Sequence, residues 1–204
     1  MTTVLVTGFG PFGEHDENPS GPAVEQLAGR WEAPAGTTLV TEVLPVSFAR
    51  ATERVRALVR EHRPAVVLGA GLAAGRDRLG LERVALNLAD ARIPDIDGSQ
   101  PVDVPVLPGE PTALLTTLPV KAARGALAAA GLPVELSLSA GSYVCNAVMY
   151  AALSAAGDGA RAGFLHVPPA EVLPVAEVTR ALGLVLDTVL ATPADVVEPG
   201  GTEH

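Results

Sequence analysis

Short apolar runs that alternate with helix-length segments constrain the fold of this chain more than any other feature of its sequence. Three runs have the length and residue types of buried strands: Val4-Leu5-Val6-Thr7-Gly8, Ala65-Val66-Val67-Leu68 and Gly163-Phe164-Leu165-His166-Val167. Further strands are expected at 38–43, 81–88 and 134–138, and helices at 20–31, 47–63, 120–130, 145–156 and 171–190. This alternation predicts one α/β domain, residues 1–204, with a twisted, mostly parallel central sheet and helices on both faces.

The segments between these elements add further expectations. Ser20 and Ser47 stand where helix N-caps are expected. Residues 89–111 contain five prolines and are predicted to be irregular, and a loop of this length is often functional. The segment from Pro193 onward is expected to fray. In a parallel sheet, sites form at the C-terminal ends of the strands. A site here would follow Gly8, Gly69, Gly141 and the strand at 163–167.

Composition disfavours several classes of function. The formal net charge is −9 and the Lys and Arg residues are scattered, which argues against binding to nucleic acid or to an anionic membrane. The first residues do not resemble a signal peptide, and no apolar run is long enough to span a membrane. One cysteine cannot form an internal disulfide, so a reducing, cytoplasmic location is expected.

That single cysteine, Cys145, follows Ser139–Val144 at the point where a predicted strand gives way to a helix. A thiol at a helix N-terminus gains thiolate character from the free N–H groups and the helix dipole. The N–H of Cys145 would also supply half of an oxyanion hole. The same position is equally typical of a small buried residue at a tight turn, so Cys145 alone does not establish a nucleophile.

A thiol nucleophile needs a base and a group that orients the base. His166 lies in an apolar strand near its C-terminal end, where core histidines are also common, but it would emerge at the same sheet edge as Cys145. Glu82 is the candidate orienting carboxylate, with a strand-end ion pair to Arg83 as the alternative. The other histidines lie in a loop, at a charged helix end and at the terminus: His15, His62 and His204.

The loop after the first strand carries two of the few aromatic residues. Phe9 and Phe12 stand among Gly and Pro residues, where neither helical nor strand periodicity would bury them. They are expected either to form a flat apolar slot or to pin the loop onto the core. Asn18 could bind a ligand or form an Asx-turn before Pro19.

A glycine motif after the strand at 65–68 suggests a different function. Gly69, Gly71 and Gly75 have a spacing similar to a dinucleotide-binding fingerprint. That function requires a helix that begins within the glycines. The sequence continues instead with Arg76 and an extended apolar run, so a nucleotide-dependent enzyme is disfavoured.

Nine segments of the chain, taken together and in order, resemble the type I pyroglutamyl peptidases (pyrrolidone-carboxylate peptidases). They are residues 4–13 (VLVTGFGPFG), 18–20 (NPS), 75–76 (GR), 82–87 (ERVALN), 90–95 (DARIPD), 98–101 (GSQP), 116–119 (TTLP), 140–146 (AGSYVCN) and 163–168 (GFLHVP). The resemblance covers almost the whole chain except its tail. It implies an α/β cysteine exopeptidase that removes pyroglutamate from peptide N-termini, without metal or organic cofactor, often as a homotetramer.

The resemblance also implies roles for individual residues. Cys145 would be the nucleophile, His166 the general base and then acid, and Glu82 the orienting carboxylate. Arg92 and the N–H of Cys145 are candidates to stabilise the oxyanion. The lactam ring of the substrate would be held by a pocket in which Phe9 and Phe12 flank it, Asn18 accepts from its N–H, and three further residues close the cavity: Ile93, Tyr143 and Val144.

Three positions depart from the family pattern. Leu72 stands where a polar residue is frequent, Ala74 replaces a glycine, and Val46 stands where Thr is common. None is one of the implied triad residues, but they put the fit of the pocket in doubt. A homologue that binds pyroglutamate or a peptide without cleaving it is therefore the alternative function.

Overall fold

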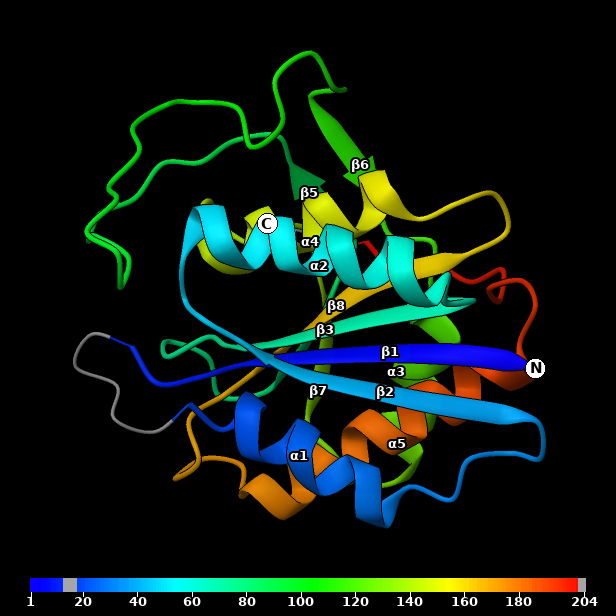
Figure 1. Cartoon of the computed structure of the whole chain (residues 1–204). Coiled ribbons are helices and arrows are strands. Elements are labelled where there is room, and N and C mark those ends of the chain that lie inside the picture. The colour runs from blue at the N-terminus through cyan, green and yellow to red at the C-terminus, as the bar shows by residue number, and fades with distance from the viewer. Residues whose placement is uncertain (13–17, 202–204) are drawn as a thin grey trace.

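A computed structural model describes residues 1–12 and 18–201 of the chain and shows a six-stranded sheet between two layers of helices (Figure 1). The strands of this sheet are β1 (Thr2–Phe9), β2 (Thr37–Leu44), β3 (Val66–Leu72), β4 (Leu79–Glu82), β7 (Val134–Ser137) and β8 (Arg161–Val167). A separate antiparallel pair is formed by β5 (Val84–Leu86) and β6 (Ala113–Leu115). The helices are α1 (Ser20–Arg30), α2 (Phe48–His62), α3 (Val120–Ala129), α4 (Val144–Ala155) and α5 (Val175–Ala191).

The sheet has the order β2-β1-β3-β8-β4-β7, and its strand directions decide where the site can form. Four of its five pairings are parallel, which confirms the predicted mostly parallel sheet. The exception is the antiparallel pairing of β4 with β8. Because β7 is parallel to β4, both strands run opposite to the other four. The C-terminal ends of β1, β2, β3 and β8 therefore lie at the same edge of the sheet. β4 and β7 run away from that edge.

Two apolar cores lie on the two faces of the sheet. One is covered by α1, α3 and α5, and the other by α2 and α4 (Figure 1). Side chains alternate between the faces along each strand. Leu165 and Val167 enter the first core, whereas Phe164 packs in the second. His166 has the same parity as Phe164 and so faces α4.

Of the two serines predicted as helix N-caps, one has that role in the structure and the other does not. Ser47 caps α2 as expected, and its hydroxyl accepts a hydrogen bond from the Arg50 N–H at 3.1 Å. Ser20 is instead the first residue of α1, after Pro19. Its hydroxyl accepts from the Phe9 N–H at 3.0 Å and donates to Asn18 at 2.7 Å. Ser20 thus connects the end of β1 to α1 rather than capping the helix.

Two further segments differ from their expected form. The run predicted as one strand at 81–88 divides at Arg83 into β4 and β5, which belong to different sheets. The last helix starts at Val175 because Pro174 sets its N-terminus, four residues later than expected. Residues 193–201, part of the segment expected to fray, contain no helix or strand. Within them Asp195 accepts hydrogen bonds from the first N–H groups of α3.

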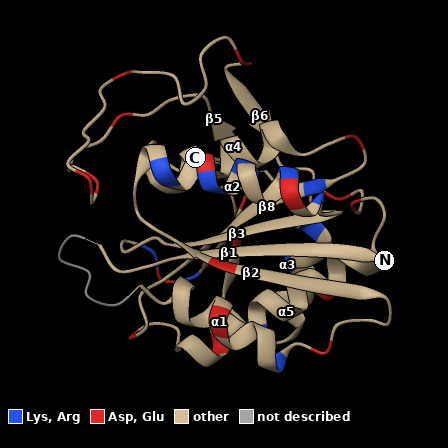
Figure 2. Cartoon of the chain, in the orientation of Figure 1, with Lys and Arg blue, Asp and Glu red and all other residues tan. Residues whose placement is uncertain are grey.

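Lys and Arg positions alternate with Asp and Glu positions along the backbone in Figure 2, for example on α2. This agrees with the scattered basic residues of the sequence. Among residues 1–12 and 18–201, no helix combines the length and the apolar character that crossing a membrane requires.

Candidate active site

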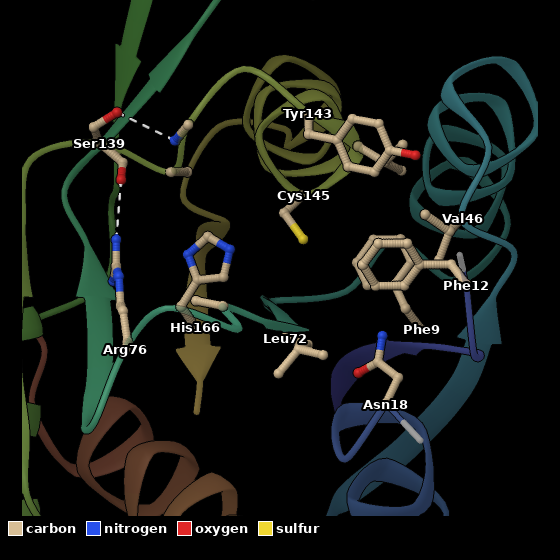
Figure 3. Close-up of a pocket in the computed structure, with 14 residues that line it drawn as sticks. Phe9, Phe12, Asn18, Val46, Leu72, Arg76, Ser139, Tyr143, Cys145 and His166 are labelled. Carbon is tan, nitrogen blue, oxygen red and sulfur yellow. Dashed lines mark hydrogen bonds between the residues drawn. The ribbon is translucent and has the colours of Figure 1, made fainter. Parts of the chain in front are cut away.

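A pocket of about 320 Å³ opens at the edge where β1, β3 and β8 end (Figure 3). It is also lined by Val46, two residues after the end of β2, and by the start of α4. Its lining residues are Phe9, Phe12, Asn18, Val46, Leu72, Ala73, Arg76, Ser139, Ala140, Gly141, Tyr143, Val144, Cys145 and His166. The expectation of a site after Gly8, Gly69 and Gly141 and at the end of the 163–167 strand is therefore met by the geometry.

Cys145 is the second residue of α4, and its thiol points into the space between His166 on one side and Phe9 and Phe12 on the other (Figure 3). The helix begins after Tyr143, which provides no side-chain cap. The first N–H groups of a helix have no partner within the helix. Among the described residues, no acceptor in another residue takes the N–H of Cys145. This N–H is thus available beside the sulfur, as an oxyanion donor requires.

The thiol is neutral in this structure, contrary to the expectation from its helix terminus. Burial, and next the charge of Glu82, raise the pKa of Cys145 to about 12. Its own N–H and the guanidinium of Arg76 lower the pKa, but they are outweighed. The helix N-terminus alone therefore does not produce a resting thiolate. Attack by this sulfur requires a base that removes its proton.

His166 and Glu82 form a buried hydrogen-bonded pair. Nδ1 of His166 lies 2.7 Å from Oε1 of Glu82, and the two residues are 5% and 0% exposed. A carboxylate accepts this bond only if Nδ1 carries the proton, which leaves Nε2 free to act as a base. The imidazole also packs on the ring of Phe164, with centroids 5.0 Å apart. Among the described residues no hydrogen bond joins the imidazole to the sulfur of Cys145.

The cation bound to Glu82 is Arg76, not Arg83. Nη1 of Arg76 donates to Oε1 of Glu82 at 2.8 Å. No ion pair between Glu82 and Arg83 occurs within the described part of the chain. Sequence reasoning placed Arg76 only within a family motif and assigned it no role. Its signal was weak, since a charged residue after a glycine-rich segment is usually a solvated loop residue.

The glycines of the fingerprint-like motif lie in and after β3. At two of these positions a side chain would not fit. A Cβ on Gly69 would lie 2.4 Å from the ring of Phe164. A Cβ on Gly71 would lie 2.7 Å from Sγ of Cys145. Both are too close for an ordinary contact. These glycines are in an extended strand, not in a turn that opens a helix, so the nucleotide hypothesis lacks its structural requirement.

The aromatic residues of the pocket come from three segments. Phe9 ends β1 and is buried, whereas Phe12 is half-buried and faces Tyr143, with ring centroids 6.1 Å apart. Tyr143 in turn contacts Phe48 edge-on at 5.2 Å. Both alternatives for the two phenylalanines thus have support: Phe9 belongs to the core, and both rings line the pocket.

Asn18 lines the pocket but its carboxamide is already engaged. Its Oδ1 accepts from both the N–H and the hydroxyl of Ser20, at 3.2 and 2.7 Å. Its Nδ2 donates to the carbonyl of Gly10 at 3.2 Å. This is the Asx-turn that the sequence left open. Because both lone pairs of Oδ1 are used, Asn18 is poorly placed to accept from a ligand, whereas Nδ2 retains one hydrogen.

Three of the expected site residues do not line the pocket. Glu82 is fully buried and is connected to the pocket through its contact with His166. Arg92 and Ile93 lie on the irregular segment 89–111, and Ile93 is 48% exposed. This segment is held to the site by the hydroxyl of Tyr143, which donates to the Pro94 carbonyl at 3.1 Å. The pocket does contain Tyr143 and Val144 as expected, and also two of the three departures from the family pattern, Val46 and Leu72.

Of the remaining histidines, His62 is the one that lies among the described residues, and it does not line this pocket. His62 is the last residue of α2 and lies 3.8 Å from Glu61. His15 and His204 lie outside the described residues.

Comparison with known proteins places the chain in one family. A family model described as pyroglutamyl peptidase matches residues 2–192. The chain is 45% identical over 170 residues to the pyrrolidone-carboxylate peptidase of Clavibacter michiganensis, covering 82% of this chain and 79% of that protein. It is 40% identical over 218 residues to that of Cupriavidus pinatubonensis, with 100% of each chain covered.

The fold is similar to that of a solved pyroglutamyl peptidase I from Bacillus amyloliquefaciens. The TM-score is 0.90 at 33% identity, covering 97% of this chain and 99% of that one. The pocket that contains the thiol, the imidazole and the aromatic side chains therefore lies in a fold shared with enzymes of that name. On these grounds the chain belongs to the pyroglutamyl peptidase family of cysteine hydrolases.

Proposed function

We propose that this protein hydrolyses the amide bond that follows an N-terminal pyroglutamyl residue, with Cys145, His166 and Glu82 as its catalytic triad. The observation that carries the proposal is the 2.7 Å contact between His166 and Glu82, beside a thiol that faces an apolar pocket. The family membership supplies the reaction, and this arrangement supplies the groups that the reaction needs.

The proposed reaction has two stages. In the first, Nε2 of His166 removes the thiol proton as Sγ of Cys145 attacks the scissile carbonyl carbon. The N–H of Cys145 stabilises the oxyanion, and the protonated imidazole gives its proton to the leaving amine as the C–N bond breaks. In the second stage His166 takes a proton from water, which attacks the thioester. Pyroglutamate leaves and the proton returns to the sulfur.

Glu82 supports both stages without exchanging a proton. Its carboxylate fixes Nδ1 of His166 as the protonated nitrogen and stabilises the imidazolium that forms at each stage. The raised pKa of Cys145 fits this sequence, because a thiol that is neutral at rest must be deprotonated during the attack.

The pocket favours a flat, uncharged ring. Phe9, Phe12 and Tyr143 offer aromatic surface, and Val46 and Leu72 are apolar. An N-terminal ammonium placed here would lose its hydration. The carboxylate of Glu82, which acts on Cys145 among the described residues, is already engaged by His166 and Arg76.

The lactam is proposed to bind Asn18 through its carbonyl rather than through its N–H. The free hydrogen on Nδ2 of Asn18 can donate to the carbonyl oxygen, whereas Oδ1 is occupied by Ser20. The oxyanion role of Arg92 stays a prediction, since its side chain does not line the pocket.

The direct test is hydrolysis of a pyroglutamyl-linked fluorogenic amide under reducing conditions with a chelator present. The matched substrate is the prolyl amide, which has the same ring size but an ammonium in place of the lactam. Cleavage of the pyroglutamyl compound alone, abolished in Cys145→Ala with unchanged thermal unfolding, is the expected result. Binding of pyroglutamate with no cleavage by folded, reduced protein would instead support the non-catalytic function.

Two further properties are proposed with this activity. A cytoplasmic location would keep the single thiol reduced. A homo-oligomer, tetrameric as the family resemblance implies, would cover the apolar side chains that the 89–111 segment exposes, namely Ile93, Ile96, Val102 and Val104. This segment lies at the top left of Figure 1, beyond α2. A monomer at micromolar concentration in light scattering would contradict the assembly.

A further inference from the structure

The guanidinium of Arg76 occupies a position between the proposed triad and the loop that leads to the nucleophile. Nη1 donates to Oε1 of Glu82 at 2.8 Å, and Nη2 donates to the Ser137 hydroxyl at 3.0 Å and the Ser139 carbonyl at 3.2 Å. Figure 3 shows the last of these contacts across the left side of the pocket. One side chain therefore connects β4, β7 and the segment that precedes Cys145.

Strand β4 has a glycine, Gly80, where the guanidinium of Arg76 lies against it. A Cβ on Gly80 would lie 2.0 Å from Nη1 of Arg76, so the guanidinium lies directly against the β4 backbone. Gly80 is paired with His166 across the antiparallel β4–β8 ladder. This direction of β4 brings Glu82 and the guanidinium to the same side of the imidazole.

Glu82 needs this cation because it has no access to solvent. It is 0% exposed, its Oε1 receives both Arg76 and His166, and its Oε2 has no hydrogen-bond partner among the described residues. A buried carboxylate without a counter-charge tends to take up a proton. A protonated Glu82 could donate to Nδ1 of His166, which would move the imidazole proton to Nε2. In that tautomer Nε2 cannot accept the thiol proton.

We propose that Arg76 is a positioning residue: it keeps Glu82 ionised and directed at Nδ1 of His166, and thereby sets the pH at which Cys145 can attack. This inference rests on the proposed function. It also makes Arg76 the charge that most directly opposes the effect of Glu82 on the thiol, since the guanidinium lowers the pKa of Cys145 while the carboxylate raises it.

The other charged groups around Arg76 do not replace it. Asp77 and Arg78 pair with each other at 2.7 Å, and Arg78 also lies 3.9 Å from Glu135 of β7. The groups that face the guanidinium from β4, β8 and α4 are Glu82, His166 and Cys145.

Removal of the positive charge of Arg76 would favour the protonated form of all three groups. Glu82 would be protonated more readily, His166 would hold its second proton more strongly, and the Cys145 thiolate would be less favoured. The changes at Glu82 and His166 move the acidic limb of the kcat/KM profile to higher pH, and the change at Cys145 slows the alkylation of its sulfur. A purely structural role would lower activity without moving that limb.

The experiment compares Arg76→Met and Arg76→Lys with Arg78→Met, which removes a 47% exposed cation two residues away that does not contact Glu82. For Arg76→Met we expect kcat/KM at neutral pH to fall about 10- to 100-fold and the acidic limb to rise by about one pH unit. Arg76→Lys should keep the limb within a few tenths of a unit, because the charge remains. Arg78→Met should match the wild type in both.

A second readout does not depend on turnover. Cys145 is the only thiol, so its alkylation by iodoacetamide can be followed directly. At a fixed pH below the thiol pKa, the rate should fall about tenfold in Arg76→Met and not in Arg78→Met. If the wild type fails to cleave the pyroglutamyl amide, the proposed function fails while this measurement still tests Arg76.

The inference is overturned if the limb and the alkylation rate stay at wild-type values in Arg76→Met, or if Arg78→Met shifts them equally. Thermal unfolding identifies variants that do not fold. Should Arg76→Met be one of them, Arg76→Gln carries the same expectations, since it removes the charge and retains a donor for Ser137.

Discussion

Substituting Gly71 by alanine would place a methyl group 2.7 Å from Sγ of Cys145 and 2.9 Å from a carbon of the Phe164 ring. Ordinary contacts between such atoms are about 3.5–4.0 Å, so the methyl group overlaps both by roughly 1 Å. Phe164 is buried and cannot move without disturbing the core. The sulfur is at the free end of a side chain in the pocket, and it is the atom that yields.

The size of the effect follows from this displacement. A reacting atom misplaced by about 1 Å can cost about 100-fold in rate. We therefore expect kcat/KM of Gly71→Ala to fall by about two orders of magnitude. Overpacking costs about 1–3 kcal/mol of folding free energy. Glycine-to-alanine replacement in a strand returns about 0.5–1 kcal/mol of it, since β3 is extended and suits alanine. The variant should stay folded.

The assay is cleavage of the pyroglutamyl amide combined with urea unfolding of the same preparations. Gly75→Ala is the control, because it lies in the same glycine motif and a Cβ there meets no atom within 4 Å. It should retain wild-type activity. Folded Gly71→Ala with wild-type kcat/KM would refute the reasoning, since the sulfur could then not be the reacting atom at the place described.

Three other perturbations test separate parts of the structure. Glu82→Gln should lower kcat about 100-fold or more with little change in KM, because it removes the carboxylate that orients the imidazole; a loss confined to KM would contradict that role. Native Cys145 should react with iodoacetamide more slowly near neutral pH than the same residue in urea, because a pKa raised to about 12 leaves less thiolate than the ordinary value of 9.0; faster native alkylation would show the opposite shift. Asp195→Ala should lower the free energy of unfolding by about 0.5–2 kcal/mol without changing kcat, because α3 loses two N-terminal hydrogen bonds; an unchanged urea midpoint would mean that water replaces them.

The sequence carried enough information for the framework of the site. Continuous apolar runs identify β1, β3 and β8, and parallel strands bring their C-terminal ends together. That rule places Phe9 and His166 at one edge. The period of each run, which decides where a strand ends, is a local property of the chain. The start of α4 reaches the same pocket although β7, the strand before it, runs in the opposite direction.

Other features could not be predicted because they depend on contacts between distant segments. The antiparallel direction of β4 is set by its neighbours in the sheet, and the apolar run at 81–88 does not reveal it. The pairing of Arg76 with Glu82 follows from that direction. The hydrogen bond from α3 to Asp195 likewise joins residues more than 70 positions apart. The contact between Glu82 and His166 joins residues 84 positions apart.

Local chemistry left two details undecided. A helix N-terminus favours a thiolate, but at Cys145 burial and a neighbouring carboxylate outweigh it. Asn18 could bind a ligand or form an Asx-turn, and the structure contains the Asx-turn, in which Ser20 occupies its oxygen. In both cases the surroundings of the residue decide the detail.

The central place of β8 has a consequence for the synthesis of this protein on the ribosome. β8 lies between β3 and β4 in the sheet, yet it is the last strand in the chain and ends at Val167. A nascent chain that stops before Arg161 leaves β3 and β4 without a shared neighbour, and Glu82 without the imidazole that completes its contacts. Such high sequence separation slows folding and exposes unpaired strand edges meanwhile. The sheet can therefore close only after β8 has been made, and the contact between Glu82 and His166 forms no earlier than that.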